Sequence, residues 1–184
     1  MRNKSYKIAL TGVFSALSLV IMTATGLFPF ATYALPAVAG VMFVPVMVEY
    51  GGKVAFSCFL ASAVLSVLLV PDKEAAMMFI ALLGHYPITK GIIERVKSRV
   101  VEYILKFILF NGVVLLIYSV IAELFGVAAL LEGMDDLGRY TGLILLVMGN
   151  FVFFLYDIGL NRIIRIYCWV IKPKIIDKII GRRK

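Results

Sequence analysis

Four polar side chains stand out because they fall within long apolar stretches of the chain. His85 and Asn150 are expected at similar depth near the middle of their stretches, and Tyr118 and Glu123 lie in the outer half of another. A polar group at membrane depth costs a few kcal/mol, so each is a functional candidate. Together they could line a cavity open to the outside, with Asn150 as donor and acceptor and His85 as a titratable partner. The alternatives are a hydrogen bond between helices for His85 and Asn150, and simple solvation for Glu123.

Two short outer segments supply further candidates. Phe30 and Tyr33 belong to the aromatic, uncharged segment 28–33. Either ring could stack on a planar ligand, although aromatic residues at this depth usually form the interfacial belt. Lys73, in the charged turn after the third apolar stretch, completes the candidate substrate-binding set. Asp72 beside it is expected to cap the next helix, because an acid at a helix N-terminus accepts hydrogen bonds from free backbone N–H groups.

The sequence offers few residues that could catalyse hydrolysis or bind a metal ion. It contains no GxxxxGK[ST] loop, so ATP hydrolysis cannot be local. A nucleophile and base would have to come from His85 with a serine such as Ser62 or Ser66, and their spacing does not favour it. One histidine and two distant cysteines, Cys58 and Cys168, make neither a metal-ligand cluster nor a disulfide framework. We therefore expect no catalytic residue, no metal site and no cofactor.

The elements that would position these residues are long apolar helices. The chain has 184 residues, of which 62% are hydrophobic and 16% charged, and a globule of this size has too much surface to hide them from water. About 20 apolar residues span a bilayer core of about 30 Å, and the stretches do not alternate as barrel strands do. We predict an all-α integral membrane six-helix bundle, a single transmembrane domain over residues 1–184. Its helices are expected at 8–30, 33–49, 54–70, 75–93, 104–125 and 140–163.

The distribution of charge predicts the topology. Of the 19 Lys and Arg residues, 17 fall at the two ends of the chain, in the gaps after the second and fourth helices, or in the helix ends next to them, and the other gaps hold only Lys73 and Arg139. By the positive-inside rule both termini are cytoplasmic in a multi-pass protein of the cell membrane. The net charge of +8 then reflects contact with anionic lipid. A nucleic-acid partner is not expected, because the basic residues are spread over several inner loops.

Two inner segments, 92–102 and 171–184, are amphipathic. Each carries a stripe of Ile or Val opposed by Lys and Arg, a pattern typical of a helix lying in the membrane interface, with docking to a partner as the alternative. Pro45 and Pro87 fall within the second and fourth helices. We expect both to kink their helices, because each removes a backbone hydrogen bond.

The first helix carries a pattern of small residues. Gly12 and Ala16 form a GxxxA groove, with Thr11 and Ser15 beside it. Such a groove lets a second helix backbone approach closely. The neighbour is either a helix of the same chain or a partner subunit.

In this arrangement the chain resembles the S components of energy-coupling factor (ECF) transporters, small six-helix membrane proteins that capture vitamins and related micronutrients. The resemblance covers the topology of the whole chain. It includes the small-residue motif of the first helix, here Gly12 to Ala16, although the family usually has Ala at the first position. The stretch from Pro71 to Ala76, leading to the Gly-His-Tyr-Pro sequence at 84–87, also looks like a family signature.

The resemblance implies a substrate-binding subunit of an ATP-driven importer for a vitamin or similar micronutrient. The ligand would be captured from the outer face by the fourth to sixth helices and the outer loops. The small residues of the first helix would contact a transmembrane T subunit, which two separate ATPase subunits drive. The whole S component would then reorient in the membrane. The identity of the ligand stays open.

Two other functions fit the same sequence. A ligand-free accessory or scaffold protein would use the first helix to hold some other complex, and its outer cavity would be filled by side chains. A stand-alone secondary transporter would need intramembrane acids and internal repeats, and the chain has few of the former and no convincing example of the latter.

Overall fold

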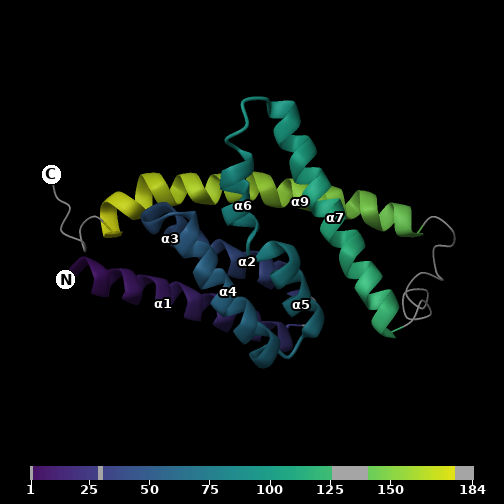
Figure 1. Ribbon diagram of the computed structural model, residues 1–184, viewed down its shortest axis with the longest axis horizontal. Coiled ribbons are helices and arrows are strands. Elements are labelled where there is room, and N and C mark those ends of the chain that lie inside the picture. Colours follow the sequence, from purple (N-terminus) through teal and green to yellow (C-terminus); the bar gives the residue numbers. More distant parts are fainter. Residues whose placement is uncertain (1, 29–30, 126–140, 177–184) are drawn as a thin grey trace. The chain divides into compact units, whose positions relative to one another are not determined.

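The computed structural model describes residues 2–28, 31–125 and 141–176, and every regular element within those ranges is a helix (Figure 1). The all-helical prediction is therefore confirmed. The chain divides into two compact units, which we name unit 1 (Met1–Ile92 with Gly159–Lys184) and unit 2 (Ile93–Ile158). The single domain over 1–184 stays a prediction.

Along the chain, the helices occur in the following order. The first, α1 (Arg2–Thr23), is extended by the 3-10 turn η1 (Ala24–Gly26). The next elements are α2 (Ala34–Val41), α3 (Phe43–Tyr50), α4 (Gly52–Leu69), α5 (Lys73–Met78), the π-helix η3 (Phe79–Leu83) and α6 (Tyr86–Ile93). The last are α7 (Arg99–Phe125), α9 (Thr141–Ile166) and the π-helix η5 (Tyr167–Ile176).

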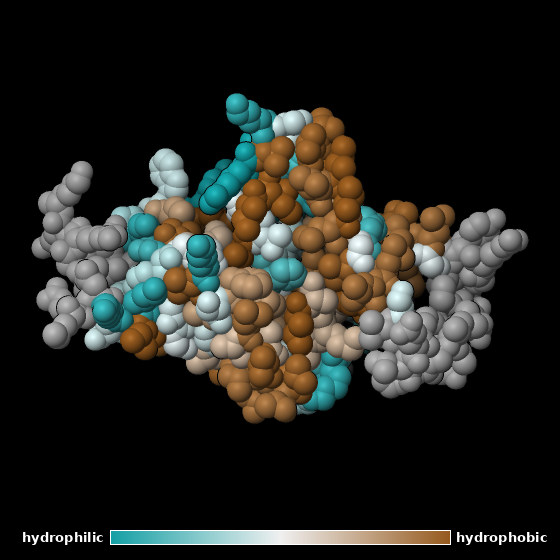
Figure 2. Space-filling model, in the orientation of Figure 1, coloured by the Kyte–Doolittle hydropathy of each residue, from teal (hydrophilic) through white to brown (hydrophobic). Residues whose placement is uncertain are grey.

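Within the residues that the structure describes, five stretches of helix are long and apolar enough to cross a membrane, which indicates a multi-pass membrane protein. Large apolar side chains stay exposed on these helices, for example Val64 at 66% and Leu68 at 73% on α4. Figure 2 shows this apolar surface over α4 and α7. Lipid is the solvent that such a surface requires. The five stretches are Lys4–Gly26, Gly52–Leu69, Lys73–Ile93, Arg99–Ile117 and Gly142–Pro173, and Ala34–Tyr50 is apolar but shorter.

Both predicted proline kinks coincide with interruptions of the helices. The second apolar stretch forms two short helices that meet at Met42, and Pro45 lies in the first turn of α3. The fourth changes from α5 into η3, turns at residues 84–85, and resumes with Pro87 in the first turn of α6. A first turn tolerates proline because its N–H groups have no partner within the helix.

The connection between α6 and α7 differs from the helix predicted over 92–102. α6 ends at Ile93, the chain turns through residues 94–98, and α7 begins at Arg99. The prediction of one interfacial helix over this segment is therefore wrong. The turn lets Glu94 Oε1 approach Lys106 Nζ to 2.9 Å. In the second amphipathic segment, residues 177–184 lie outside the described part of the chain.

Three phenylalanines form the centre of unit 1. Phe43 of α3, Phe59 of α4 and Phe79 of η3 are at most 4% exposed, and their ring centroids lie 5.8 to 6.3 Å apart. Close beside them, α2 crosses η3. A Cβ atom on Gly40 would lie only 2.1 Å from the carbonyl oxygen of Leu83, so only glycine fits this crossing.

The start of α1 and the C-terminal helix both contact the end of α3. Lys7 Nζ lies 5.7 Å from the centroid of the Tyr50 ring, and Lys172 Nζ lies 3.2 Å from Glu49 Oε1. Glu49 and Tyr50 are neighbours at the end of α3, so residues 7 and 172 lie on the same side of unit 1. In Figure 1 the start of α1, the end of α3 and the yellow helical end that follows α9 lie together on the left.

Unit 2 is built from α7 and the part of α9 up to Ile158. Lys106 of α7 bonds to Asp157 of α9 at 3.0 Å, and Asn111 bonds to Asn150 at 2.9 Å. Residue numbers rise along α7 while those of the partners on α9 fall. The two helices are therefore antiparallel neighbours.

Candidate functional site

Asp72 organises the connection that precedes α5. Its Oδ1 accepts a hydrogen bond from the backbone N–H of Ala75 at 3.0 Å, so it is the N-cap of α5, as predicted. Its Oδ2 accepts a second hydrogen bond from the hydroxyl of Thr32 at 2.8 Å. One carboxylate thus joins the segment before α2 to the start of α5.

Tyr33 and Lys73, two of the candidate ligand residues, lie at the same connection. The hydroxyl of Tyr33 donates to the carboxylate of Glu74, while 56% of the residue stays exposed. The ammonium of Lys73 donates to the backbone carbonyls of Val67 and Val70, at 2.9 and 3.0 Å, and so satisfies the end of α4. Both residues have a structural partner, and the ring of Tyr33 keeps an open face.

His85 lies farther along the same polypeptide. It is 12 residues after Lys73, which corresponds to about 18 Å along a helix. Its ring stacks on the Phe59 ring with centroids 5.5 Å apart and planes at 29°. Its Nδ1 atom is buried, and no hydrogen-bond partner for it occurs among the described residues. His85 is therefore fixed against an aromatic ring, directly after the π-helix η3, an element that often marks functional sites.

Asn150 forms a reciprocal amide pair with Asn111 in unit 2. Each Nδ2 donates to the other residue's Oδ1 at 2.9 Å. The second hydrogens go to backbone carbonyls within the helices, Asn111 to Phe107 and Asn150 to Leu146, both at 2.8 Å. Asn150 thus makes the interhelical hydrogen bond of the second interpretation. Its N–H donors are used, so only oxygen lone pairs remain for a ligand.

The other candidate ligand residues cannot be assigned contacts. Tyr118 and Glu123 lie on α7, but their side chains are outside the described part of the structure, as is the whole of Phe30. Their roles as ligand contacts stay predictions. Tyr33 and Lys73 share one end of unit 1, whereas Asn150 belongs to unit 2.

A buried ion network in unit 2 was not anticipated from the sequence. Lys106 Nζ, with a side chain only 2% exposed, donates to Glu102 at 2.8 Å, to Glu94 at 2.9 Å and to Asp157 at 3.0 Å. Glu102 and Asp157 are themselves 4% and 3% exposed, and Arg99 reaches Glu102 from the surface at 3.2 Å. The sequence signals were an acid inside the last apolar stretch and a Glu–Lys pair four residues apart on a helix.

The geometry of this network suits a structural role. An ammonium group has three hydrogens, and Lys106 makes three charge-assisted hydrogen bonds with them. The bonds join the α6–α7 turn, α7 and α9. Buried ions are stable only when they are paired in this way. The network therefore holds unit 2 together at this level and offers a ligand no unused donor on Lys106.

The small residues of α1 lie on an open face. Gly12 and Ala16 are exposed, and no described atom outside the helix comes within 4 Å of the position that a Cβ on Gly12 would take. The opposite face of α1 is buried through Leu10, Ser18 and Met22. Thr11 and Ser15 are half-buried beside the groove. α1 therefore has one face in the core of unit 1 and one free for another helix or for lipid.

Two apolar hollows accompany these features. One is a shallow groove along one face of α7, lined by successive turns from Val100 to Asn111. The other, of about 240 Å³, lies in unit 1 between Phe14 of α1, the α2–α3 break and the residues from Ile163 to Ile171 at the end of α9 and in η5. Neither is lined by Tyr33, Lys73 or His85. Among the described residues no cluster of His, Cys, Asp or Glu could hold a metal ion.

Comparisons with protein-family models, with curated proteins and with solved structures give no match to this chain.

Proposed function

We propose that this chain is the substrate-capture subunit of an ATP-driven micronutrient importer in the cell membrane, an S component of the ECF type with both termini in the cytoplasm. It would bind a vitamin or vitamin-like molecule from the outer face and associate through α1 with a T subunit. ATP hydrolysis would belong to two other subunits.

The open face of α1 carries this proposal. Gly12 and Ala16 are one turn apart, exposed and without a neighbouring helix among the described residues of their unit. In lipid, helices associate through close contact of small residues, because apolar side chains gain nothing by leaving the hydrocarbon. A small-residue groove facing outward from a helix that is already half buried is therefore suited to a partner helix.

The ligand would be held at the outer end of the bundle. Tyr33 contributes a partly exposed ring, and hydrogen bonds from Thr32 and Tyr33 to Asp72 and Glu74 already order the segments around it. Such preorganisation favours tight binding, since less conformational entropy is lost when the ligand arrives.

Association with a T subunit tests the proposal. Gly12→Leu with Ala16→Leu fills the groove, and we expect the purified double variant to lose co-purification with T and ATPase subunits co-expressed from the same source. The matched control is Gly112→Leu on α7, where a Cβ also meets no described atom within 4 Å, and this variant should still co-purify. If the wild-type chain never co-purifies with such subunits, the proposal fails.

A ligand-free accessory protein is the second candidate. It is favoured by one observation, that Tyr33, Lys73 and Asn150 each already bond within the chain and line neither of the two hollows. Mass spectrometry of small molecules retained after gentle purification separates the two functions. A stoichiometric micronutrient supports capture, whereas its absence together with an intact multisubunit complex supports the accessory role.

A further inference from the structure

We propose that the 240 Å³ apolar cavity of unit 1 holds an acyl chain of an anionic phospholipid. The lipid would come from the leaflet at the end of the unit where residues 7 and 172 lie. The cavity walls come from three parts of the unit: Phe14 of α1, Val41 and Pro45 at the α2–α3 break, and Ile163, Ile166 and Ile171 of the C-terminal helix. The proposal rests on the membrane location of the chain but not on substrate capture.

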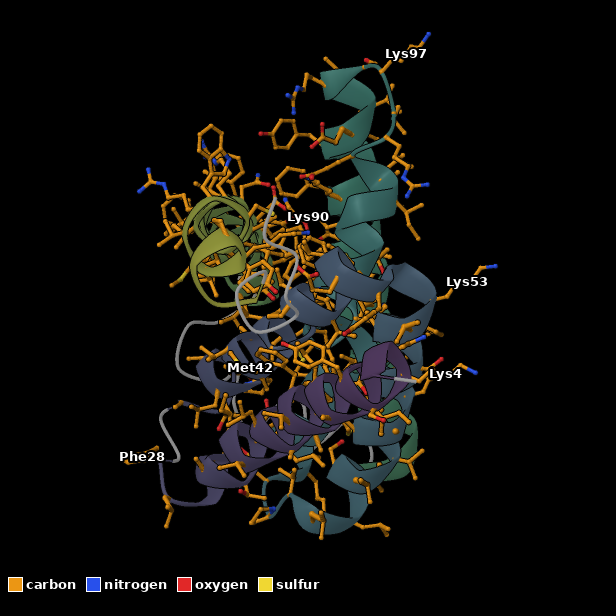
Figure 3. The ribbon with its side chains drawn as sticks, turned by 90° about the vertical axis from the view of Figure 1, so that its left-hand side faces the viewer. Lys4, Phe28, Met42, Lys53, Lys90 and Lys97 are labelled. Atoms are coloured by element: carbon orange, nitrogen blue, oxygen red, sulfur yellow. The ribbon has the colours of Figure 1, made fainter. Side chains whose placement is uncertain are left out.

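Irregular helix geometry creates the cavity. The second apolar stretch breaks at Met42, which is labelled in Figure 3, and the C-terminal helix changes from α to π geometry at Tyr167. At both places the helix surfaces cannot follow each other closely. Protein interiors leave few voids larger than a water molecule. This one is open to the surroundings, since the wall residues Ile163 and Ile166 are 41% and 55% exposed. An exposed apolar hollow in a membrane protein faces lipid, so hydrocarbon is the occupant that matches it.

The charges around the cavity select an anionic headgroup. Arg162 and Arg165 are exposed and alternate along the helix with the wall residues Ile163 and Ile166. Each such cation near the surface attracts anionic lipid. The cavity is therefore flanked by positive charge on its C-terminal helix.

Two more cations lie near the hollow. Lys172 follows the wall residue Ile171 on the same C-terminal helix and is paired with Glu49, whose side chain is 2% exposed. Lys7 on α1 precedes the wall residue Phe14 by seven residues, about 10 Å along the helix. A headgroup at the level of Lys7 would thus place the upper part of its acyl chain beside Phe14.

Lipid binding to the full-length chain tests the proposal. Purified protein in detergent is incubated with equal amounts of phosphatidylglycerol and phosphatidylcholine, and the bound lipids are counted by native mass spectrometry. We expect preferential retention of phosphatidylglycerol. Val41→Phe fills the cavity and should reduce this retention severalfold, whereas Val64→Phe, on the exposed surface of α4, should leave it unchanged.

A second pair of variants covers the case in which Val41→Phe does not fold. Arg162→Gln with Arg165→Gln should weaken retention by about fivefold for each charge removed, while Lys53→Gln, at the exposed start of α4, should not. Equal retention of both lipids by the wild type would overturn the proposal. So would unchanged retention in a folded Val41→Phe variant, since the cavity would then belong to another occupant, such as the C-terminal tail.

Discussion

Hydrogen bonds stabilise the buried position of the Lys106 side chain. Its ammonium is buried in unit 2 and bonds to three carboxylates, two of which are almost fully buried. Leaving an ion unpaired in such a place costs more than the pair contributes when intact. The residue is therefore a point where a single substitution has a large effect.

We expect Lys106→Met to destabilise the protein strongly. It removes the ammonium group from the buried carboxylate of Asp157 and leaves Glu102 with Arg99 as its cation. Breaking a buried pair in this way costs about 3 to 5 kcal/mol. Thermal unfolding of the purified protein in detergent measures the effect. Lys97→Met, at an exposed position, is the control and should unfold like the wild type, and equal stability of the two variants would contradict the assigned role of Lys106.

At the same scale, the sequence identified Asn150 and His85 as special but not what they contact. A polar residue within an apolar stretch can be recognised from the sequence alone, and Asn150 is a candidate for that reason. Its partner Asn111 is 39 residues away, and no local pattern joins the two. The cap at Asp72 was predictable because its partner Ala75 is only three residues away.

The helices of unit 1 depend on close crossings at particular glycines. Gly40 allows α2 to approach the carbonyl oxygen of Leu83 in η3, whereas Gly12 on α1 faces open space. In the sequence, both glycines are small residues within apolar stretches, and nothing distinguishes one from the other. Only the position of the neighbouring helix separates a crossing glycine from a surface one.

Gly40→Ala should therefore destabilise the protein while Gly12→Ala should not. The added methyl on residue 40 would lie 2.1 Å from the Leu83 carbonyl oxygen, so α2 and η3 must move apart, and overpacking of this kind costs about 1 to 3 kcal/mol. The same change at residue 12 replaces glycine within a helix and gains about 0.5 to 1 kcal/mol. Melting temperatures in one detergent compare the variants, and a tolerated Gly40→Ala would show that the crossing is looser than described.

At the scale of the whole molecule, the chain forms two compact units. The sequence contained no sign of this division, because the apolar stretches on either side of residue 93 are alike in composition. The return of the chain into unit 1 at Gly159 depends on contacts such as Glu49 with Lys172. Those contacts also bring residues 7 and 172 to one end of unit 1, while the cytoplasmic location of both termini stays a prediction.

The predicted topology can be tested by labelling. In a chain with Cys58→Ala and Cys168→Ala, Asp135→Cys should react with a membrane-impermeant maleimide on intact cells. Lys97→Cys should react only after the membrane is permeabilised, because the positive-inside rule places its loop in the cytoplasm. The reverse pattern would overturn the orientation and, with it, capture of a ligand from outside.

Composition and charge, read along the chain, were enough to predict an all-helical protein of the membrane, because the length of an apolar stretch and the asymmetry of Lys and Arg are local properties that lipid imposes on any chain. Tertiary structure decided which of the polar groups are already paired. It joined Lys106 to Asp157 across 51 residues, and it buried one face of α1 while leaving Gly12 and Ala16 open. Hydrogen bonds and helix contacts between distant segments depend on how the helices pack in three dimensions. The order of residue types along the chain does not specify that packing.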